Sequence, residues 1–347
     1  MLLLKNRTEI ANYDFDYLNK VEIRSSWDML TDTATLLLPK KITYRNRKNK
    51  ITKVITGSTE NVSDDKYPVF VQGDQADLSG GYGDDVPLIF TGFIRSISPN
   101  YPIKIDFEDN MYWLKNVYID DFSEPRKPKT TISLQEVMNL IMVDPSLSHI
   151  KLNVADGFEF GLLRFPPTTV AGILEYFKKE FGLMSWFRGD TLNVGLAYLD
   201  EQPESVKIHR FISSGLGVNI ISTDNLEYKT DDQVRIKLVV TSWYPDNSKK
   251  SIEVGDPNGE KRDYKVYNIP EDSMKKMGEE FLKQLVYEGF RGYFETFLLP
   301  IVKHGEAVKL SDPEFPDRDG IYLVKEVIYS YGVEGGRQKI TLDRKIS

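Results

Sequence analysis

A β-rich pattern occurs twice in this chain, at residues 69–115 and again in degraded form near the C-terminus. The first copy reads QGDQADL, GYGDD, LIFTGFIRSIS and IKIDFED, and the second reads KHGEAVKL, GIYLVKEVIYS and QKITLDR. Gly73 and Phe90 are seventeen positions apart, as are Gly305 and Tyr322. Runs of Val, Ile, Phe and Tyr between Gly, Pro and Asp are typical of antiparallel strands with tight connections. We therefore predict two related β-units, with chance similarity of short strands as the alternative.

A true duplication makes a specific structural prediction, because equivalent strands must use the same alternation of buried and exposed side chains. Residues 73–109 should superimpose on residues 305–344. Within them, Phe90 should match Tyr322, and residues 103–107 should match 339–342 after a longer hairpin loop.

The composition limits the class of protein. A chain of 347 residues is long for one hydrophobic core, so two or three domains are expected. The 40% hydrophobic content supports packed cores, and a net charge of -7 argues against a protein that coats nucleic acid. There are no cysteines, which excludes disulfides and thiolate chemistry. The start MLLLKNRTE is too short for a signal peptide, and no apolar run is long enough for a membrane anchor.

The first β-unit contains a basic segment. Residues 1–40 alternate as strands do, and residues 40–53 then carry seven lysines and arginines. We interpret residues 40–66 as a long loop or extended hairpin inserted in the unit. Long loops in compact domains are often functional, so we take the segment as a candidate contact surface, with a solvated loop as the alternative. The interface candidates are Arg45, Arg47, Lys48 and Lys50.

The middle of the chain predicts a small α+β module. FSEPRKPKTT at residues 122–131 reads as a linker, since its prolines fit neither a helix interior nor a central strand. Ser133 and Glu136 form a capping box, and a second helix starts after Thr168 or Thr169 and stops at Gly182. A hairpin turning at 189–190 follows. A further helix, starting after Pro270, is predicted within the second β-unit.

Candidate chemistry is weak. Glu108 and Asp109 could suggest paired carboxylates, but neighbours on a strand point to opposite faces. The aspartates at 84, 85, 312, 317 and 319 lack the spacing of a calcium loop and fit turns better. The histidines at 149, 209 and 304 share no motif, and Arg188-Gly189-Asp190 fits a hairpin turn. We expect no catalytic residues, no cofactor and no metal.

Several segments resemble one family, the baseplate hub proteins of contractile phage tails, including the late control protein D group and the hub portion of type VI secretion spike proteins. The carrying segments are residues 25–39, 72–85, 90–102, 107–116 and 305–332. The resemblance implies an α+β, mainly β fold with two tail-tube-like antiparallel β-barrel domains separated by the small α+β module. The expected domains are residues 1–124 with the inserted loop 40–66, residues 131–204, and residues 205–347 with a helix at 271–288.

The resemblance also implies a function. The chain would be a structural, non-enzymatic baseplate hub, a homotrimer that adapts the six-fold tail tube to a three-fold central spike around an axial channel. Its expected partners are itself, the tail tube protein, the spike protein and, further, the tape-measure and other baseplate proteins, with DNA only in transit. The expected location is the virion tail baseplate, assembled in the host cytoplasm. The alternatives are the hub of a phage-derived injection or secretion apparatus and a carbohydrate-binding or glycan-degrading β-protein.

Overall fold

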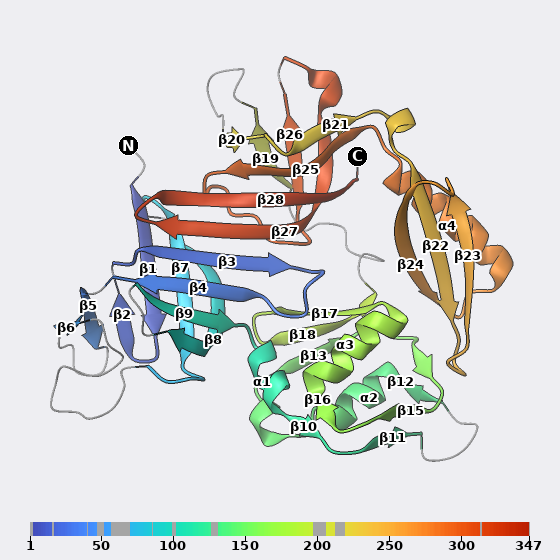
Figure 1. Cartoon of the computed structure of the whole chain (residues 1–347), viewed down its shortest axis with the longest axis horizontal. Helices are drawn as coiled ribbons and strands as arrows, with labels where there is room; N and C mark the ends of the chain where they lie inside the picture. The colour runs from blue at the N-terminus through green and yellow to red at the C-terminus, as the bar shows by residue number, and fades with distance from the viewer. Residues whose placement is uncertain are drawn as a thin grey trace.

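The computed structural model describes residues 3–15, 17–39, 41–46, 52–56, 70–84, 86–98, 102–125, 131–196, 206–211, 219–312 and 314–346. At 41–46 and 52–56 it describes the backbone alone. Two β-units share one extended sheet, and two smaller modules lie to one side of it (Figure 1). The fold is mainly β, as predicted. No helix in the described ranges is long and apolar enough to span a membrane.

The first β-unit is a two-layered antiparallel structure. Its strands are β1 (Leu4–Ile10), β2 (Tyr13–Phe15), β3 (Lys20–Ser26), β4 (Thr33–Leu38), β5 (Lys41–Asn46), β6 (Thr52–Thr56), β7 (Gln75–Tyr82), β8 (Leu88–Ser98) and β9 (Ile103–Glu108). Strands β3, β4, β9 and β8 pair in that order, and β7 continues from β8 to β1. In Figure 1, β1 and β7 cross behind β3 and β4. Strands β5 and β6 pair as a hairpin, so the extended-hairpin interpretation holds for the described part of residues 40–66.

The central module forms around its own core. It contains α1 (Met111–Asn116), β10 (Tyr118–Ile119), β11 (Phe122–Glu124), β12 (Ile132–Ser133), α2 (Leu134–Ile141), η1 (Pro145–Leu147), β13 (Lys151–Val154), β14 (Glu159–Phe160), β15 (Leu163–Phe165), β16 (Thr168–Thr169), α3 (Val170–Phe181), β17 (Leu183–Arg188) and β18 (Thr191–Leu196). The predicted capping box of Ser133 and Glu136 starts α2. Thr169 caps α3, and Gly182 ends it at a φ of 73°. The local signals were therefore sufficient to predict both helices.

Residues 111–124 pack with the central module, whereas the sequence-based domain limit assigned them to the first β-unit. Met111 and Leu114 of α1 are buried in the core of the central module. Strands β10 and β11 pair with β16 and β15 of that module, so these residues leave the first β-unit after β9. The prolines at 125 and 128 had marked a linker, but they do not mark the change of core. The three-part division itself stays a proposal.

The second β-unit carries an insertion. Its strands are β19 (Val206–Arg210), β20 (Ile220–Ser222), β21 (Leu226–Lys229), β25 (Gly289–Thr296), β26 (Ala307–Ser311), β27 (Gly320–Gly332) and β28 (Gly335–Lys345), with short turns η3 (Asp231–Gln233) and η4 (Pro316–Arg318). The insertion consists of β22 (Ile236–Trp243), β23 (Lys249–Gly255), β24 (Glu260–Tyr267) and α4 (Glu271–Leu285). Met274 and the apolar face of α4 pack on these strands, so the predicted helix covers a separate small sheet.

The two β-units join edge to edge. Strand β27 pairs with β3 over seven residue pairs, from Glu326↔Ser26 to Gly332↔Lys20. The result is one continuous sheet in the order β20-β25-β28-β27-β3-β4-β9-β8, which we call the joined sheet. Figure 1 shows β27 and β28 lying directly alongside β3 and β4, although some 300 residues separate them in sequence. One hydrophobic core runs beneath both units.

Candidate functional site: the joined sheet and its polar junction

The two β-units repeat the same hydrogen bonds. The amide of Gly73 donates to the carbonyl of Ile94 at 2.8 Å, and the amide of Gly305 donates to the carbonyl of Val324 at 2.8 Å. Ile94 and Val324 donate in return to the next residue on the facing segment, Asp74 and Glu306, at 2.9 Å each. These matched bonds make Gly73 equivalent to Gly305 and Ile94 equivalent to Val324, which supports duplication over chance similarity.

The predicted match of Phe90 with Tyr322 is wrong by two residues. Ala76 lies opposite Gly92 in the first unit, whereas Val308 lies opposite Tyr322 in the second, so Tyr322 corresponds to Gly92. The second copy reaches its middle strand in two fewer residues, so equal sequence spacing was misleading. A two-residue shift keeps the same face, which is why the alternation alone did not reveal it.

The aromatic residue and the glycine have exchanged places between the copies. In the first unit, a Cβ on Gly92 would strike the ring of Phe90. In the second unit, a Cβ on Gly320 would lie 2.8 Å from the Tyr322 hydroxyl. An aromatic ring beside a strand glycine can fill the space that the missing side chain leaves. In both copies an aromatic ring therefore lies beside the glycine of the pair, but the ring comes from the first position in one copy (Phe90) and from the second in the other (Tyr322).

The third strands also correspond. Ile94 faces Phe107 and Val324 faces Leu342, so the predicted match of 103–107 with 339–342 is confirmed at its C-terminal end. A bulge follows at the same place in both copies, at Arg95 and at Lys325. Because bulges bend a strand and increase its twist, the two copies share their curvature as well as their order.

The joined sheet has two open edges. Among the described residues, β8 beyond Phe93 pairs only with β9, whereas its equivalent in the second copy, β27, pairs with both β28 and β3. On the other side, within the described part of the chain, β20 and β21 pair only with β25. Strand β3 would likewise pair only with β4 if β27 were absent. The open edge at β8 is thus equivalent to β27, and the open edge at β20 and β21 is equivalent to β3. Strands β27 and β3 are the two that pair with each other in the middle of the joined sheet.

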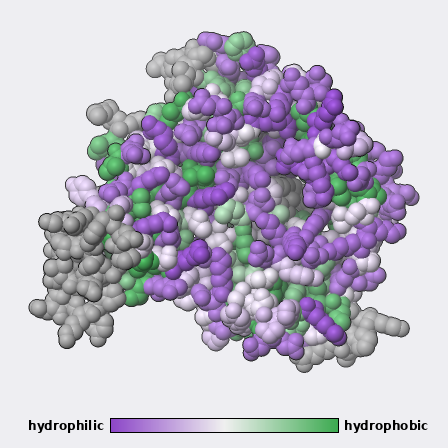
Figure 2. All heavy atoms as spheres, viewed as in Figure 1, coloured by the Kyte–Doolittle hydropathy of each residue, from purple (hydrophilic) through white to green (hydrophobic). Residues whose placement is uncertain are grey.

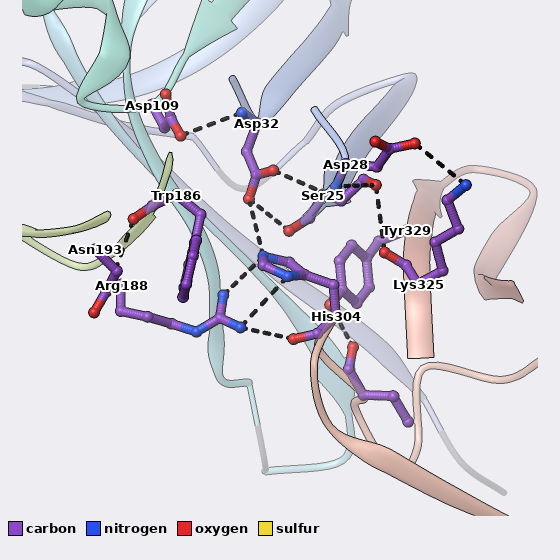
Figure 3. A network of polar contacts seen from close by, with 12 residues as sticks. Ser25, Asp28, Asp32, Asp109, Trp186, Arg188, Asn193, His304, Lys325 and Tyr329 are labelled. Carbon is purple, nitrogen blue, oxygen red and sulfur yellow. Dashed lines mark hydrogen bonds and ion pairs between the residues drawn. The ribbon is translucent and has the colours of Figure 1, made fainter. Parts of the chain in front are cut away.

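A buried polar network holds the two units and the central module together (Figure 3). Asp32 accepts hydrogen bonds from the Ser25 hydroxyl at 2.5 Å and the Ser26 amide at 3.1 Å. Its own amide donates to Oδ2 of Asp109 at 3.2 Å. His304 from the second unit lies with Nε2 3.9 Å from Oδ2 of Asp32. We call this set of contacts the polar junction.

The central module reaches the polar junction through Arg188. Its Nη1 lies 2.7 Å from Nε2 of His304, and its Nη2 donates to the His304 carbonyl at 2.7 Å. Nearby, Asn110 donates through its side-chain amide to the carbonyl of Gly189 at 3.1 Å. These bonds fix the orientation of the β17–β18 hairpin against both β-units.

Burial changes the proton affinities at the polar junction. Burial raises the pKa of Asp32 to about 6, against the lowering effect of its hydrogen bonds from Ser25 and Ser26 and of the Arg188 charge. Burial, together with the Asp32 charge, raises the pKa of Asp109 well above its usual value.

Burial also lowers the pKa of His304, to about 3, with smaller contributions from the charges of Arg188 and Lys303. His304 is therefore neutral at pH 7 and accepts the Arg188 hydrogen bond.

The sequence did not single out this network. The sequence shows His304 only as a histidine without a motif, and no motif includes Asp32. The available signal was position: His304 directly precedes Gly305, where the second copy begins, and Asp109 directly follows the last strand of the first copy.

The predicted interface residues lie mostly outside the described ranges. Arg47, Lys48 and Lys50 are not described. Arg45 is placed by its backbone in β5, opposite Asp14 and Thr52. Their proposed contacts stay a prediction.

The other candidate residues take structural positions. Glu108 is 4% exposed and bonded to Lys115 at 2.9 Å and Arg95 at 3.2 Å, while Asp109 accepts from the Met111 amide at 3.0 Å. The two carboxyls thus have different partners. Asp319 accepts from the Ser311 hydroxyl and the Asp312 amide, as a turn requires.

The remaining motifs are also accounted for. Gly189, at a φ of 59°, turns the β17–β18 hairpin as predicted. His209 packs on Phe294, with 5.2 Å between ring centroids. In the described part of the chain, no group of three or more His, Asp or Glu residues is arranged to hold a metal ion.

Two solved structures with a similar fold are tail proteins. A tail protein from Neisseria meningitidis MC58 is 15% identical and matches over 99% of this chain and 96% of its own, with a TM-score of 0.61. The 43 kDa tail protein of prophage MuSo2 from Shewanella oneidensis is 14% identical over 99% and 98%, with a TM-score of 0.57. No protein-family model matches the sequence, and no curated protein is significantly similar to it.

A third similar structure comes from a secretion system. This Escherichia coli protein is a component of the type VI secretion system described as similar to bacteriophage T4 tail proteins. It is 8% identical, with a TM-score of 0.53, and matches over 99% of this chain and 76% of its own. At these identities the likeness shows the fold alone. The resemblance inferred from sequence is therefore confirmed as a shared fold of phage tail and type VI secretion proteins.

Proposed function

We propose that this chain is a structural hub of a phage-type tail, and that three copies close into a ring around an axial channel. The observation that carries the proposal is the pairing of β27 with β3. It shows how one β-unit adds its edge to the next, and the two open edges of the joined sheet are equivalent to the strands that make this contact. An unpaired strand edge is a ready template for such addition.

Repetition of that junction between chains would give a closed ring. Pairing β8 of one copy with β21 of the next is a heterologous contact, which forms a ring if the rotation closes. Each chain contributes two β-units, so three chains supply six similar units, matching a six-fold tube on one side and a three-fold spike on the other. We therefore propose a homotrimer whose neighbours along the axis are a tail tube protein and a central spike protein.

The end of the joined sheet offers a surface for one of these neighbours. Leu3, Phe297, Leu299 and Val333 are exposed there, with Val333 79% exposed at the turn between β27 and β28. Leu4 and Leu298, next to Leu3, Phe297 and Leu299 in sequence, lie against Gly336, where an added Cβ would be 2.8 Å from each. Apolar residues gathered at one end of the strands favour a protein contact along the axis.

The secretion-system hub is the second candidate, favoured by the fold shared with the Escherichia coli protein. A secretion-system hub would form the same trimeric ring as a phage-tail hub and would differ only in the larger assembly to which the ring belongs. The glycan-degrading alternative has less support, because the neighbouring carboxylates of Glu108 and Asp109 are held in separate hydrogen-bonding networks.

Native mass spectrometry of the purified chain over a range of concentrations tests the proposal. We expect a species of three chains, visible as a ring by negative-stain electron microscopy. A chain that stays monomeric at all concentrations, or that forms open-ended filaments, would contradict the trimeric ring.

A further inference from the structure

We propose that the uncovered face of the joined sheet is the wall of the channel, and that its ion pairs keep a polyanionic double helix from being held there. This inference rests on the proposed ring and adds the chemistry of what passes through it. It concerns the face of β3, β4, β9 and β27 that is turned away from the core.

The geometry of the sheet identifies this face. Ile23, Leu36, Ile105 and Val327 point into the core and are at most 1% exposed. Their sequence neighbours therefore point the opposite way, because side chains alternate along a strand. Strands β1, β7 and β26 lie on the core side, where their Ile10, Leu78 and Leu310 belong to the same hydrophobic core, so the opposite face is the one free to line a lumen. Figure 2 shows this side of the molecule as predominantly hydrophilic, with scattered hydrophobic residues.

Such a lumen would be wide. Three joined sheets of eight strands each make a barrel of twenty-four strands. Barrels of 16 to 18 strands already leave an aqueous channel, and spacing and tilt give about 48 Å between opposite backbones in the larger barrel. A nucleic acid duplex could therefore pass, and the charge of the wall would decide whether it slides or binds.

The cations of β3 and β9 on this face have carboxylate partners. Lys20 Nζ lies 2.8 Å from Glu22, and Lys104 Nζ lies 3.0 Å from Asp106. Arg24 Nη2 lies 2.9 Å from Glu326, across the β3–β27 junction.

Asp106 is held in the charged form. Burial opposes its ionisation, but hydrogen bonds from Thr35, Lys104 and Ser96 outweigh that effect and lower its pKa. The Thr35 hydroxyl donates at 2.7 Å and the Ser96 hydroxyl at 3.2 Å. The carboxylate that pairs with Lys104 is therefore held in place by hydrogen bonds from the two neighbouring strands, β4 and β8.

Paired cations change how the wall meets a polyanion. An unpaired lysine or arginine binds a phosphate by releasing condensed counterions, and several such contacts hold DNA strongly at low salt. A cation that is already paired with a carboxylate binds phosphate more weakly, because its charge is neutralised before the DNA arrives. The part of the wall formed by β3, β4, β9 and β27 therefore offers paired charges, which suits transit. On the same face of β28, the Nζ atom of Lys339 lies over the Tyr293 ring, 3.5 Å from its centroid.

The experiment removes the carboxylates while keeping their shape. The variant E22Q/D106N/E326Q leaves Lys20, Lys104 and Arg24 unpaired, which unmasks nine cations per trimer. The matched control, E253Q/E260Q/D263N, makes the same charge change on the inserted sheet, where these residues pair with Lys237, Arg262 and Lys261. Binding is measured with fluorescent linear duplex DNA and with covalently closed circular DNA, across a salt series.

We expect the wall variant to bind linear DNA at least about tenfold more tightly than the control at low salt, with a steeper salt dependence. It should not bind closed circles to the same extent, because a circle has no end to thread through a ring. Tight binding by the wild type, equal binding by the two variants, or equal binding of circles and linear DNA would each overturn the inference.

Two further measurements keep the outcomes distinct. If loss of Asp106 prevents folding, the pair E22Q/E326Q and its control E253Q/E260Q take the place of the triple variants. Native mass is recorded in the same buffers. A wall variant that forms a trimer but binds linear DNA no better than its control refutes the neutral wall and leaves the hub standing, whereas a wild type that never forms a trimer refutes both.

Discussion

The guanidinium of Arg188 bonds to both the ring and the backbone of His304, with Nη1 2.7 Å from Nε2 and Nη2 2.7 Å from the carbonyl oxygen. Arg188 ends β17 of the central module, while His304 directly precedes Gly305, where the second copy of the repeat begins. The Oδ2 atom of Asp32, from the first β-unit, lies 3.9 Å from Nε2 of the same imidazole. One side chain of the module therefore helps fix the relative position of the two β-units.

Replacing Arg188 with alanine should loosen this connection. The His304 carbonyl and ring nitrogen would lose their donor, so we expect a loss of about 1 kcal/mol in the free energy of unfolding. Urea denaturation measures it, with Arg164→Ala on the exposed side of β15 as the control. An R188A protein as stable as R164A would show that the bond does not support the assembly of the three parts.

The buried His209 should make the protein sensitive to acid. Burial lowers the pKa of His209 to about 4 from the ordinary 6.5, so the unfolded chain binds a proton more readily than the folded one. Its contribution to stability is present above pH 6.5 and is lost as the pH falls towards 4, by about 3 kcal/mol in all.

The variant His209→Phe should remove this part of the acid sensitivity, measured as unfolding free energy between pH 4 and 7. The control Phe294→Leu disturbs the same contact but keeps the imidazole, so it should lower stability while preserving the slope with pH. A slope unchanged in H209F would contradict the assignment.

The exchanged glycine and aromatic positions predict unequal effects of a methyl group. In Gly92→Ala the new Cβ would overlap the Glu108 carbonyl oxygen as well as the Phe90 ring, so the backbone must move. In Gly320→Ala the close atoms belong to the side chains of Tyr322 and Lys345, which can shift. We expect thermal or urea unfolding to show a loss of about 2 kcal/mol or more for G92A and about 1 kcal/mol for G320A. The reverse order would contradict the conclusion that the backbone contact at Gly92 is the costlier one.

Local sequence patterns predicted the elements better than their assembly. The capping box at Ser133, the stop at Gly182 and the apolar stripe of α4 identified all three of these helices, because such signals act within a few residues. The pairing of β3 with β27 left no local trace, since a strand edge is the same whichever strand pairs with it. The two-residue offset between the copies was hidden for a similar reason, because it preserves which residues face the core.

The basic segment remains a predicted contact surface. Reversing charge at Arg45, Arg47 and Lys48 should weaken contacts with another subunit or a neighbouring protein, and the loss should depend on salt because exposed charges are screened. Mass photometry over a salt series measures the assembly. The control reverses three exposed cations of the inserted sheet, Lys250, Lys261 and Arg262. Equal assembly of both variants would place the basic segment away from every interface.

The register of the proposed contact between chains can be derived from the contact within the chain. Ser26 faces Glu326 and Arg24 faces Ile328 at the β3–β27 junction. The bulges and hydrogen bonds shared by the two copies make Glu326 equivalent to Ser96 and Ile328 equivalent to Ser98. The pairing of β4 and β25 with their neighbours relates Ser26 to Lys229 and Arg24 to Glu227. Ser98 of one copy should therefore face Glu227 of the next.

A disulfide can test that register, because the chain has no cysteine of its own. In S98C/E227C the two side chains should lie on the same face of the sheet at cross-strand distance, and mild oxidation should join chains covalently. In the control S98C/Y228C the second cysteine points to the opposite face, so cross-linking should fall sharply. Denaturing gels should show a ladder that ends at three chains, because each copy in a closed ring bonds to two others. Equal cross-linking of both variants would reject the register, and a ladder that continues beyond three would mean that the edges pair without closing.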